Sequence, residues 1–124
     1  MEKVTGIGGL FFRAKDPAAL KKWYHEHLGI GMEPGSWAQE AGPTEIAPFE
    51  LSSDYFPPSQ AWMMNFRVRD LDAMIGQLEM AHIEVITNEE WNSVIGRFVR
   101  IHDPEGNPVE LWEPSQMVID HYGL

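Results

Sequence analysis

The sequence predicts an α+β fold made of two similar halves, each with a strand, a helix and about three further strands. The first observation is an internal repeat, in which "FRAKDPAA" at residues 12–19 corresponds to "FRVRDLDA" at residues 66–73. In both places an apolar, strand-like run precedes the repeat and a helical pattern follows it. The second observation is size. Neither half could bury its sheet alone, so we expect the two halves to pair.

Two helices are predicted, and each begins at an aspartate. Asp16 precedes Pro17, which is typical of a helix start because Asp accepts from free N–H groups and Pro fits the first turn. Gly29 predicts the end of this helix. Asp70 begins the second helix in the same way. Apolar residues then follow at helical spacing, as Leu20, Trp23, Tyr24 and Leu28 in the first helix and Leu71, Met74, Ile75 and Leu78 in the second.

The strands are clearest around "DPEGN" at residues 103–107, where the positions of Asp, Pro and Gly fit a type I turn. The flanking runs "RFVRIH" (97–102) and "PVELWE" (108–113) therefore predict a β-hairpin. Other predicted strands are "IEVI" (83–86) in the second half, and "SWAQEA" (36–41) and "TEIAPFEL" (44–51) in the first. The chain of residues 1–124 is thus one domain, with module one at about 1–51, a linker at about 52–60 and module two at about 61–124.

Charge and composition exclude several kinds of partner and site. Nine basic residues against nineteen acidic ones give a net charge of −10, which disfavours binding to nucleic acid or to an anionic membrane surface. The chain has no cysteine, and this excludes disulfides and thiolate metal sites. The N-terminal apolar run is too short for a membrane span and lacks the order of a secretory signal. We therefore expect a cytoplasmic protein.

Strand alternation divides the polar and apolar side chains between two faces. Trp62, Met64, Phe66 and Val68 form an apolar face that we expect under the helices. If His102 faces Pro108 across the turn, Arg100 lies directly opposite Glu110. The opposite face then contains Met63, Asn65, Arg67, Arg100, His102, Glu110 and Trp112 from the second half, and Gly9, Phe11 and Arg13 from the first.

The pattern resembles the vicinal oxygen chelate superfamily, which includes glyoxalase I, bleomycin-resistance proteins and extradiol dioxygenases. The similar segments are "KDPAALKKWYHEHLGI" (15–30), "FRVRDLDAMIGQL" (66–78) and "DPEGNPVELWEP" (103–114), and the likeness spans almost the whole chain. It implies two paired βαβββ modules whose sheets curl around a shared cavity, usually within a homodimer. It does not indicate one reaction, since members of this fold perform several unrelated ones.

The resemblance also implies where a metal would lie. Metal-using members take ligands from the first strand of each module, at positions that are Gly9 and Met63 here, and from the last strand, where Glu110 matches. The segment "PFEL" (48–51) is similar to "PVEL" (108–111), which suggests Glu50 as a second carboxylate. Such a site would have no imidazole, whereas zinc, nickel and iron(II) normally need nitrogen or sulfur donors. The alternatives for Glu110 are an ion pair with Arg100, a divalent metal, or a lone exposed carboxylate.

The residues on the implied cavity face suit a small planar or anionic organic ligand. Our hypothesis is that Asn65, Arg67 and Arg100 orient an anionic or carbonyl-bearing ligand, with Phe11 and Trp112 as walls. The contrasting interpretation is that these side chains fill the cavity and bond one another. His102 is either a general base or an exposed strand end. Trp91, in the polar loop "NEEWNSVIG" (88–96), is expected at a dimer contact or the rim of the pocket.

Two functions follow from these expectations. The first is a binding protein, similar to the bleomycin-resistance branch, that holds a small organic ligand in its cavity without a metal or other cofactor. Eight residues form its expected ligand site: Phe11, Met63, Asn65, Arg67, Arg100, His102, Glu110 and Trp112. The second is a metal-dependent lyase or dioxygenase that uses Glu110 at an atypical site. Gly9 and Met63 favour the first, because neither supplies the usual histidine. No catalytic residue is assigned.

Overall fold

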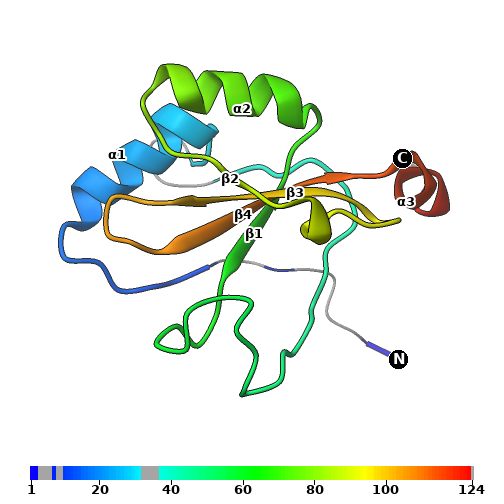
Figure 1. The fold of residues 1–124 in the computed structure, drawn as a ribbon. Coiled ribbons are helices and arrows are strands. Elements are labelled where there is room, and N and C mark those ends of the chain that lie inside the picture. Colours follow the sequence, from blue (N-terminus) through cyan, green and yellow to red (C-terminus); the bar gives the residue numbers. More distant parts are fainter. Residues whose placement is uncertain (3–6, 8–9, 32–36, 124) are drawn as a thin grey trace.

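The computed structural model describes residues 1–2, 7, 10–31 and 37–123 (Figure 1). Its elements in chain order are α1 (Pro17–Leu28), β1 (Met64–Arg67), α2 (Leu71–Met80), β2 (Ile86–Thr87), the 3-10 turn η1 (Glu89–Trp91), β3 (Gly96–His102), β4 (Pro108–Pro114) and α3 (Gln116–His121). The second half therefore has the predicted order of one strand, one helix and three strands. None of the helices in the described residues is long and apolar enough to span a membrane.

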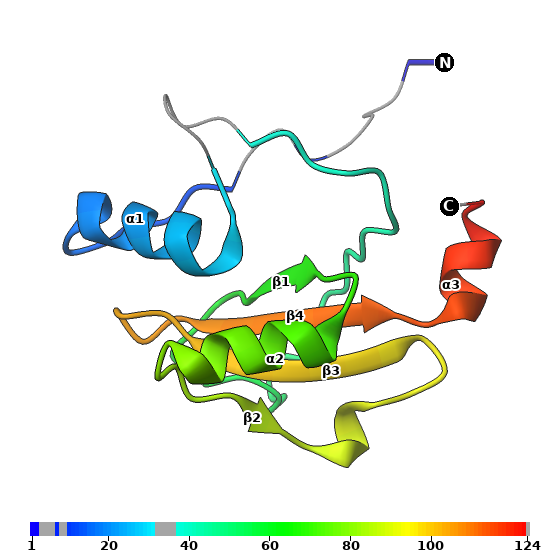
Figure 2. The ribbon, with the colours of Figure 1, turned by 90° about the horizontal axis from the view of Figure 1, so that it is seen from above.

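The four strands form one mixed sheet in the order β1-β4-β3-β2. β1 runs parallel to β4, whereas β3 is antiparallel to both of its neighbours. α1 and α2 lie over one face of this sheet, and the linker after residue 50 runs along the opposite face (Figures 1 and 2). The sheet thus has a face covered by helices and a second face crossed by the linker.

The core lies between the sheet and the two helices, on the face that the alternation predicts. Its buried residues are Met64, Val99, Ile101, Val109 and Leu111 from the sheet, Leu20 and Tyr24 from α1, and Leu71 and Leu78 from α2. Phe66 and Val68 pack against this cluster. Trp62 lies at its margin, 38% exposed, with its ring 5.6 Å from that of Phe12.

Both helices begin as predicted, because the repeat supplies the same cap twice. The side chain of Asp16 accepts a hydrogen bond from the backbone N–H of Ala19 at 3.1 Å, and Asp70 accepts from Ala73 at 3.0 Å. Gly29 ends α1 in the left-handed conformation, with φ of 67°. The helix boundaries are therefore set by short-range hydrogen bonding.

The β3–β4 turn is docked onto α1. Asp103 is buried and accepts hydrogen bonds from the hydroxyl of Tyr24 at 2.7 Å and from the backbone N–H of Asn107 at 2.9 Å. In the same turn, the Glu105 carboxylate accepts from the backbone N–H groups of Lys15 and Asp16. These contacts fix the start of α1 against the hairpin.

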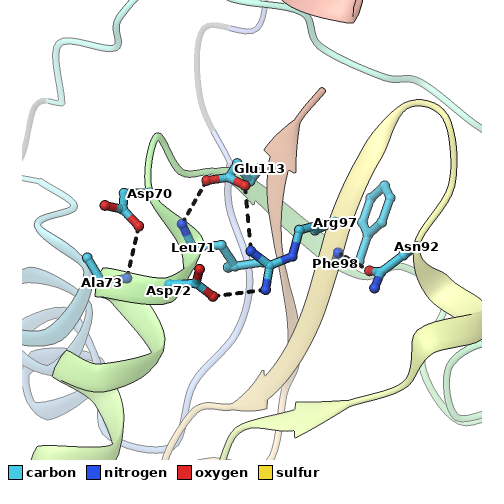
Figure 3. Close-up of polar contacts among 8 residues, drawn as sticks. All are labelled: Asp70, Leu71, Asp72, Ala73, Asn92, Arg97, Phe98 and Glu113. Atoms are coloured by element: carbon cyan, nitrogen blue, oxygen red, sulfur yellow. Dashed lines mark hydrogen bonds and ion pairs between the residues drawn. The ribbon is translucent and has the colours of Figure 1, made fainter. Parts of the chain in front are cut away.

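A second polar group ties α2 to the other end of the hairpin (Figure 3). The guanidinium of Arg97 lies 2.9 Å from the carboxylate of Asp72 and 3.9 Å from that of Glu113. Glu113 also accepts a hydrogen bond from the backbone N–H of Leu71 at 3.1 Å. Because the Asp72 side chain is 78% exposed and that of Arg97 is 45% exposed, their ion pair positions α2 more than it stabilises the fold.

The predicted strands of the first half are wrong within the described residues. Residues 37–41 and 44–51 are not strands, and neither is the segment 10–14. The outer edge of β1 instead contacts this part of the chain through a side chain, since Arg67 donates to the carbonyl groups of Glu40 and Pro43. Pro43 and Pro48 also lack the N–H that a ladder needs. The pairing of two complete modules therefore stays a prediction.

Candidate functional site

The predicted polar face exists on the sheet, and its central residues come from three adjacent strands. Asn65 on β1 is in register with Glu110 on β4, and Glu110 is in register with Arg100 on β3. His102 pairs with Pro108, which confirms the predicted register of the hairpin. This row of an amide, a carboxylate and a guanidinium is the centre of the candidate site.

Glu110 is 7% exposed and bonded through both oxygens. Asn65 Nδ2 donates to Oε1 at 2.8 Å, and the hydroxyl of Tyr55 donates to Oε2. A buried carboxylate needs such donors, because an ionised group without partners is costly to remove from water. The alternative of a lone exposed carboxylate is therefore wrong.

Arg100 lies opposite Glu110, as expected, but the predicted ion pair between them is wrong. Both residues belong to the described part of the chain, and no salt bridge joins them. Instead, Arg100 Nη2 donates to the backbone carbonyl of Tyr55 at 3.0 Å. Its guanidinium carbon lies 5.1 Å from the ring centroid of Tyr55 and 5.0 Å from that of Trp91. Two aromatic rings thus replace the carboxylate as partners of the cation.

Tyr55, from the linker, is the residue that the sequence analysis missed. It contacts Glu110 through its hydroxyl and Arg100 through its ring and carbonyl. Burial and the hydrogen bond to Glu110 raise the pKa of Tyr55 above its ordinary value, so the phenol stays protonated. The available signal was a large aromatic residue in a short polar and Pro-rich linker. Trp91, another large aromatic residue in a polar loop, lies at the same cluster.

Arg67 has a different role from the one predicted. Its Nη1 donates to the Pro43 carbonyl and to Thr44 Oγ1, and its Nη2 donates to the Glu40 carbonyl at 3.0 Å. Gly42 permits this approach, because a Cβ there would lie 2.5 Å from Arg67 Nε. The guanidinium therefore holds the segment 40–44, and most of its donors are already used.

Trp112 offers almost no surface to a ligand. It is 2% exposed, its indole N–H donates to the Ile95 carbonyl at 3.0 Å, and its ring is parallel to that of Phe98 with centroids 5.9 Å apart. Gly96 is required beside it, since a Cβ at this position would lie 2.7 Å from Trp112 Nε1. In this structure the Trp112 side chain fills the space between the sheet and the loop that precedes β3.

Within the described part of the chain, the other predicted site residues form no hydrogen bond with this cluster. Phe11 is 94% exposed, and His102 is exposed at the end of β3. Met63 is half-buried just before β1. Gly9 lies outside the described residues. The structure therefore brings Asn65, Arg100 and Glu110 together, and leaves Phe11 and His102 outside that group.

The described side chains around Glu110 do not supply the ligand set that a transition metal usually needs. Both carboxylate oxygens accept hydrogen bonds from neutral donors, and the neighbour across the strand is a guanidinium. Met63 lies at the matching first-strand position, and Glu50 is exposed. Within the residues that the structure describes, no three His, Asp or Glu side chains are grouped to hold an ion. The donor chemistry thus lacks the nitrogen ligands that a transition metal prefers.

A separate pocket of about 280 Å³ lies on the helix side of β1. Leu28 from α1, Phe66 from β1 and Met74 from α2 contribute to its lining, together with Arg67. Arg100 and Glu110 are not among the lining residues. This apolar pocket and the polar row on the sheet are therefore two different places.

Two solved structures share this architecture. TnmS3, an antibiotic binding protein from Streptomyces sp. CB03234, aligns with 93% of this chain and 100% of its own, with a TM-score of 0.62 and 21% sequence identity. A glyoxalase/bleomycin resistance protein from the same organism aligns with 80% of this chain and 92% of its own, with a TM-score of 0.51 and 22% identity. The chain has the glyoxalase/bleomycin resistance fold. No protein-family model and no curated protein matches its sequence.

The likeness confirms the predicted fold class, an α+β fold of the glyoxalase-like kind. At this level of identity it establishes the fold alone, because one fold supports many functions. The features that bear on function are therefore the row of Asn65, Glu110 and Arg100 and the aromatic side chains beside it.

Proposed function

We propose that the protein binds a small organic ligand on the polar face of its sheet, at Arg100 and Glu110, without a metal. The observation that supports this most directly is the state of Arg100. The residue is 8% exposed, yet no described residue accepts a hydrogen bond from its Nε. A buried N–H without a partner costs roughly 1–3 kcal/mol, and a ligand oxygen at this place would remove the cost.

The surroundings of Arg100 suit a planar molecule. The rings of Tyr55 and Trp91 lie within 5.1 Å of the guanidinium, and Glu110 provides a carboxylate acceptor beside it. Ligand sites typically combine aromatic walls with a few placed polar groups. The shared fold with an antibiotic binding protein and a bleomycin resistance protein favours an antibiotic-like ligand here.

The test is a thermal-shift screen of bleomycin and other aromatic antibiotics against the wild type and Arg100→Gln. We expect at least one compound to raise the melting temperature of the wild type and to fail with Arg100→Gln. Arg69→Gln is the matched control, because the Arg69 side chain is 83% exposed and pairs with Glu40 away from the cluster. A shift that survives in Arg100→Gln would place the ligand elsewhere, for instance in the pocket beside Phe66.

Metal analysis tests the alternative hypothesis that Glu110 binds a divalent metal. The purified protein would be assayed for bound metal after incubation with nickel, zinc, manganese and iron(II). We expect no stoichiometric metal, because the Glu110 oxygens already accept from Tyr55 and Asn65. Stoichiometric metal that is lost in Glu110→Ala would instead support the lyase or dioxygenase function. Assays of those reactions would then follow.

Homodimer formation and a cytoplasmic location belong to the same proposal. Several apolar side chains of the first half are exposed in the single chain, among them Phe11 at 94%, Ile46 at 82% and Leu51 at 103%. Large apolar side chains are the ones that a subunit interface would cover. Light scattering after size-exclusion chromatography would give the mass in solution. Cell fractionation would give the location.

A further inference from the structure

We propose that Tyr55 is a built-in occupant of the ligand site, and that the ligand which replaces it is a hydroxyphenyl carboxylate. This inference rests on the proposed function and names the chemical class of its ligand. It starts from the observation that one tyrosine already satisfies several groups at the site. The chemistry of the occupant therefore indicates the chemistry of the ligand.

Tyr55 interacts with the site through three parts of its structure. The hydroxyl donates to Glu110, the ring lies over the Arg100 guanidinium at 5.1 Å, and the backbone carbonyl accepts from Arg100 Nη2 at 3.0 Å. The edge of the ring also meets Trp91, at a centroid distance of 6.1 Å and an interplanar angle of 65°. An external molecule with a phenol at one end and an oxygen acceptor at the other would make the same contacts.

Tyr55 leaves the Nε–H of Arg100 without a hydrogen-bond acceptor, and this indicates which acceptor group the ligand carries. Nε and Nη2 form one edge of the Arg100 guanidinium, and a carboxylate can accept from both in parallel. The Tyr55 carbonyl has a single oxygen, bonded to Nη2, while Nε has no partner among the described residues. A carboxylate in the place of that carbonyl would satisfy both N–H groups. It would also place a negative charge against a buried cation that has no ion pair with Glu110.

The spacing of the two ends follows from tyrosine itself. In 3-(4-hydroxyphenyl)propionate the ring, two carbons and the carboxyl carbon correspond atom for atom to the ring, Cβ, Cα and carbonyl carbon of Tyr55. The compound adds the second oxygen that Nε lacks. It is therefore the simplest probe of the proposed ligand class.

The linker can release Tyr55 with few other losses. Its other hydrogen bonds are local, from Ser53 N–H to the Glu50 carbonyl, from Tyr55 N–H to Ser53 Oγ, and from Gln60 N–H to the Pro57 carbonyl. Within the described part of the chain, only Tyr55 bonds the linker to the sheet. Most linker residues, such as Asp54 and Pro58, are exposed. Moving the linker away would break the Tyr55 contacts and leave the sheet intact.

Calorimetric titration of 3-(4-hydroxyphenyl)propionate into the wild type and Tyr55→Ala tests this. We expect Tyr55→Ala to bind at least about tenfold more tightly, because no internal phenol competes for the site. With Tyr55→Ala, 3-phenylpropionate should bind about tenfold more weakly because it lacks the donor to Glu110. The uncharged 3-(4-hydroxyphenyl)propionamide should bind Tyr55→Ala about tenfold more weakly than the acid does. The acid should also bind Tyr55→Ala/Arg100→Lys about tenfold more weakly than it binds Tyr55→Ala.

A second measurement does not depend on the folding of the variant. Amide hydrogen exchange of the wild type with the probe should become faster in residues 52–60 and slower in β3 and β4. Equal affinity for the wild type and Tyr55→Ala, or protection of the linker by the probe, would overturn displacement. No binding to either protein at about 10 mM would overturn the ligand class.

The two proposals can fail separately. A compound from the antibiotic screen that needs Arg100, together with no binding of the hydroxyphenyl acid, would preserve the binding function and reject this ligand class. Absence of both would reject both. Tyr55→Phe is an intermediate case, since it keeps the ring over Arg100 but removes the hydroxyl that bonds Glu110. The probe should therefore bind Tyr55→Phe more tightly than the wild type and less tightly than Tyr55→Ala.

Discussion

Arg100 and Glu110 lie directly opposite each other in the β3–β4 ladder, yet each bonds to Tyr55 and they form no ion pair with each other. The phenol hydroxyl bonds the carboxylate, while the ring and the carbonyl of the same residue bond the guanidinium. Two charges of opposite sign are thus joined through one neutral side chain. This arrangement stabilises the linker on the sheet, and it makes Tyr55 the residue whose removal should be most informative.

Tyr55→Phe should lower the free energy of unfolding by about 1–3 kcal/mol, because Glu110 is buried and would lose one of its two donors. Urea denaturation of the variant and the wild type would measure this. Tyr122→Phe is the control, since Tyr122 is 54% exposed, and it should change the free energy by less than about 0.5 kcal/mol. Equal losses in both variants would show that the phenol–carboxylate bond contributes nothing specific.

Stability should fall as the pH rises above about 10, the ordinary pKa of tyrosine. Burial, followed by the hydrogen bond to Asp103, raises the pKa of Tyr24, and burial with the hydrogen bond to Glu110 raises the pKa of Tyr55. The unfolded chain therefore releases these protons at lower pH than the folded chain does. Since the folded state then binds more protons, a rise in pH favours unfolding.

Urea denaturation between about pH 9 and 11 would test this dependence. The double variant Tyr24→Phe/Tyr55→Phe should be less stable at neutral pH, because it lacks both hydroxyl bonds. Its stability should nevertheless decline less steeply through this range than that of the wild type. An unchanged slope in the double variant would assign the alkaline decline to other groups.

Arg67→Ala should free the segment 40–44, because this guanidinium donates to the Glu40 carbonyl, the Pro43 carbonyl and Thr44 Oγ1. We expect faster proteolytic cleavage in this segment and a loss of about 1–3 kcal/mol in the free energy of unfolding. Arg69→Ala is the control, since its ion pair with Glu40 is exposed and should matter little. Cleavage sites that do not move to this segment would contradict the anchoring role.

Gly96→Ala should destabilise the protein by about 2 kcal/mol or more, because Gly96 has φ of +139° and a Cβ there would strike Trp112 and the Glu113 carbonyl. The matched control is Gly76→Ala in α2, where a Cβ meets nothing within 4 Å. That variant should gain about 0.5–1 kcal/mol from helix propensity. Melting curves of both variants would give opposite signs, and a neutral Gly96→Ala would show that the strand relaxes around the added methyl group.

The sequence by itself determined the fold class, the two helix starts, the hairpin and the position of Arg100 opposite Glu110. Each of these depends on a few neighbouring residues. Asp16 and Asp70 bond to N–H groups three residues away, and alternation along a strand assigns Met64 to one face and Asn65 to the other. Hydrogen bonds between near neighbours fix the helix starts, and the alternation of side chains along a strand fixes which face each one lies on. The rest of the chain therefore has little influence on these features.

Only the tertiary structure decided which side chains meet at the polar face. Tyr55 lies 55 positions before Glu110 and 45 before Arg100, and no pattern within the linker predicts that it reaches both. Similarly, Arg67 is directed to the segment 40–44, and Trp112 is buried under the loop that contains Ile95. Contacts of this kind depend on the path of a loop through space, because loop residues have no periodicity that fixes where their side chains point.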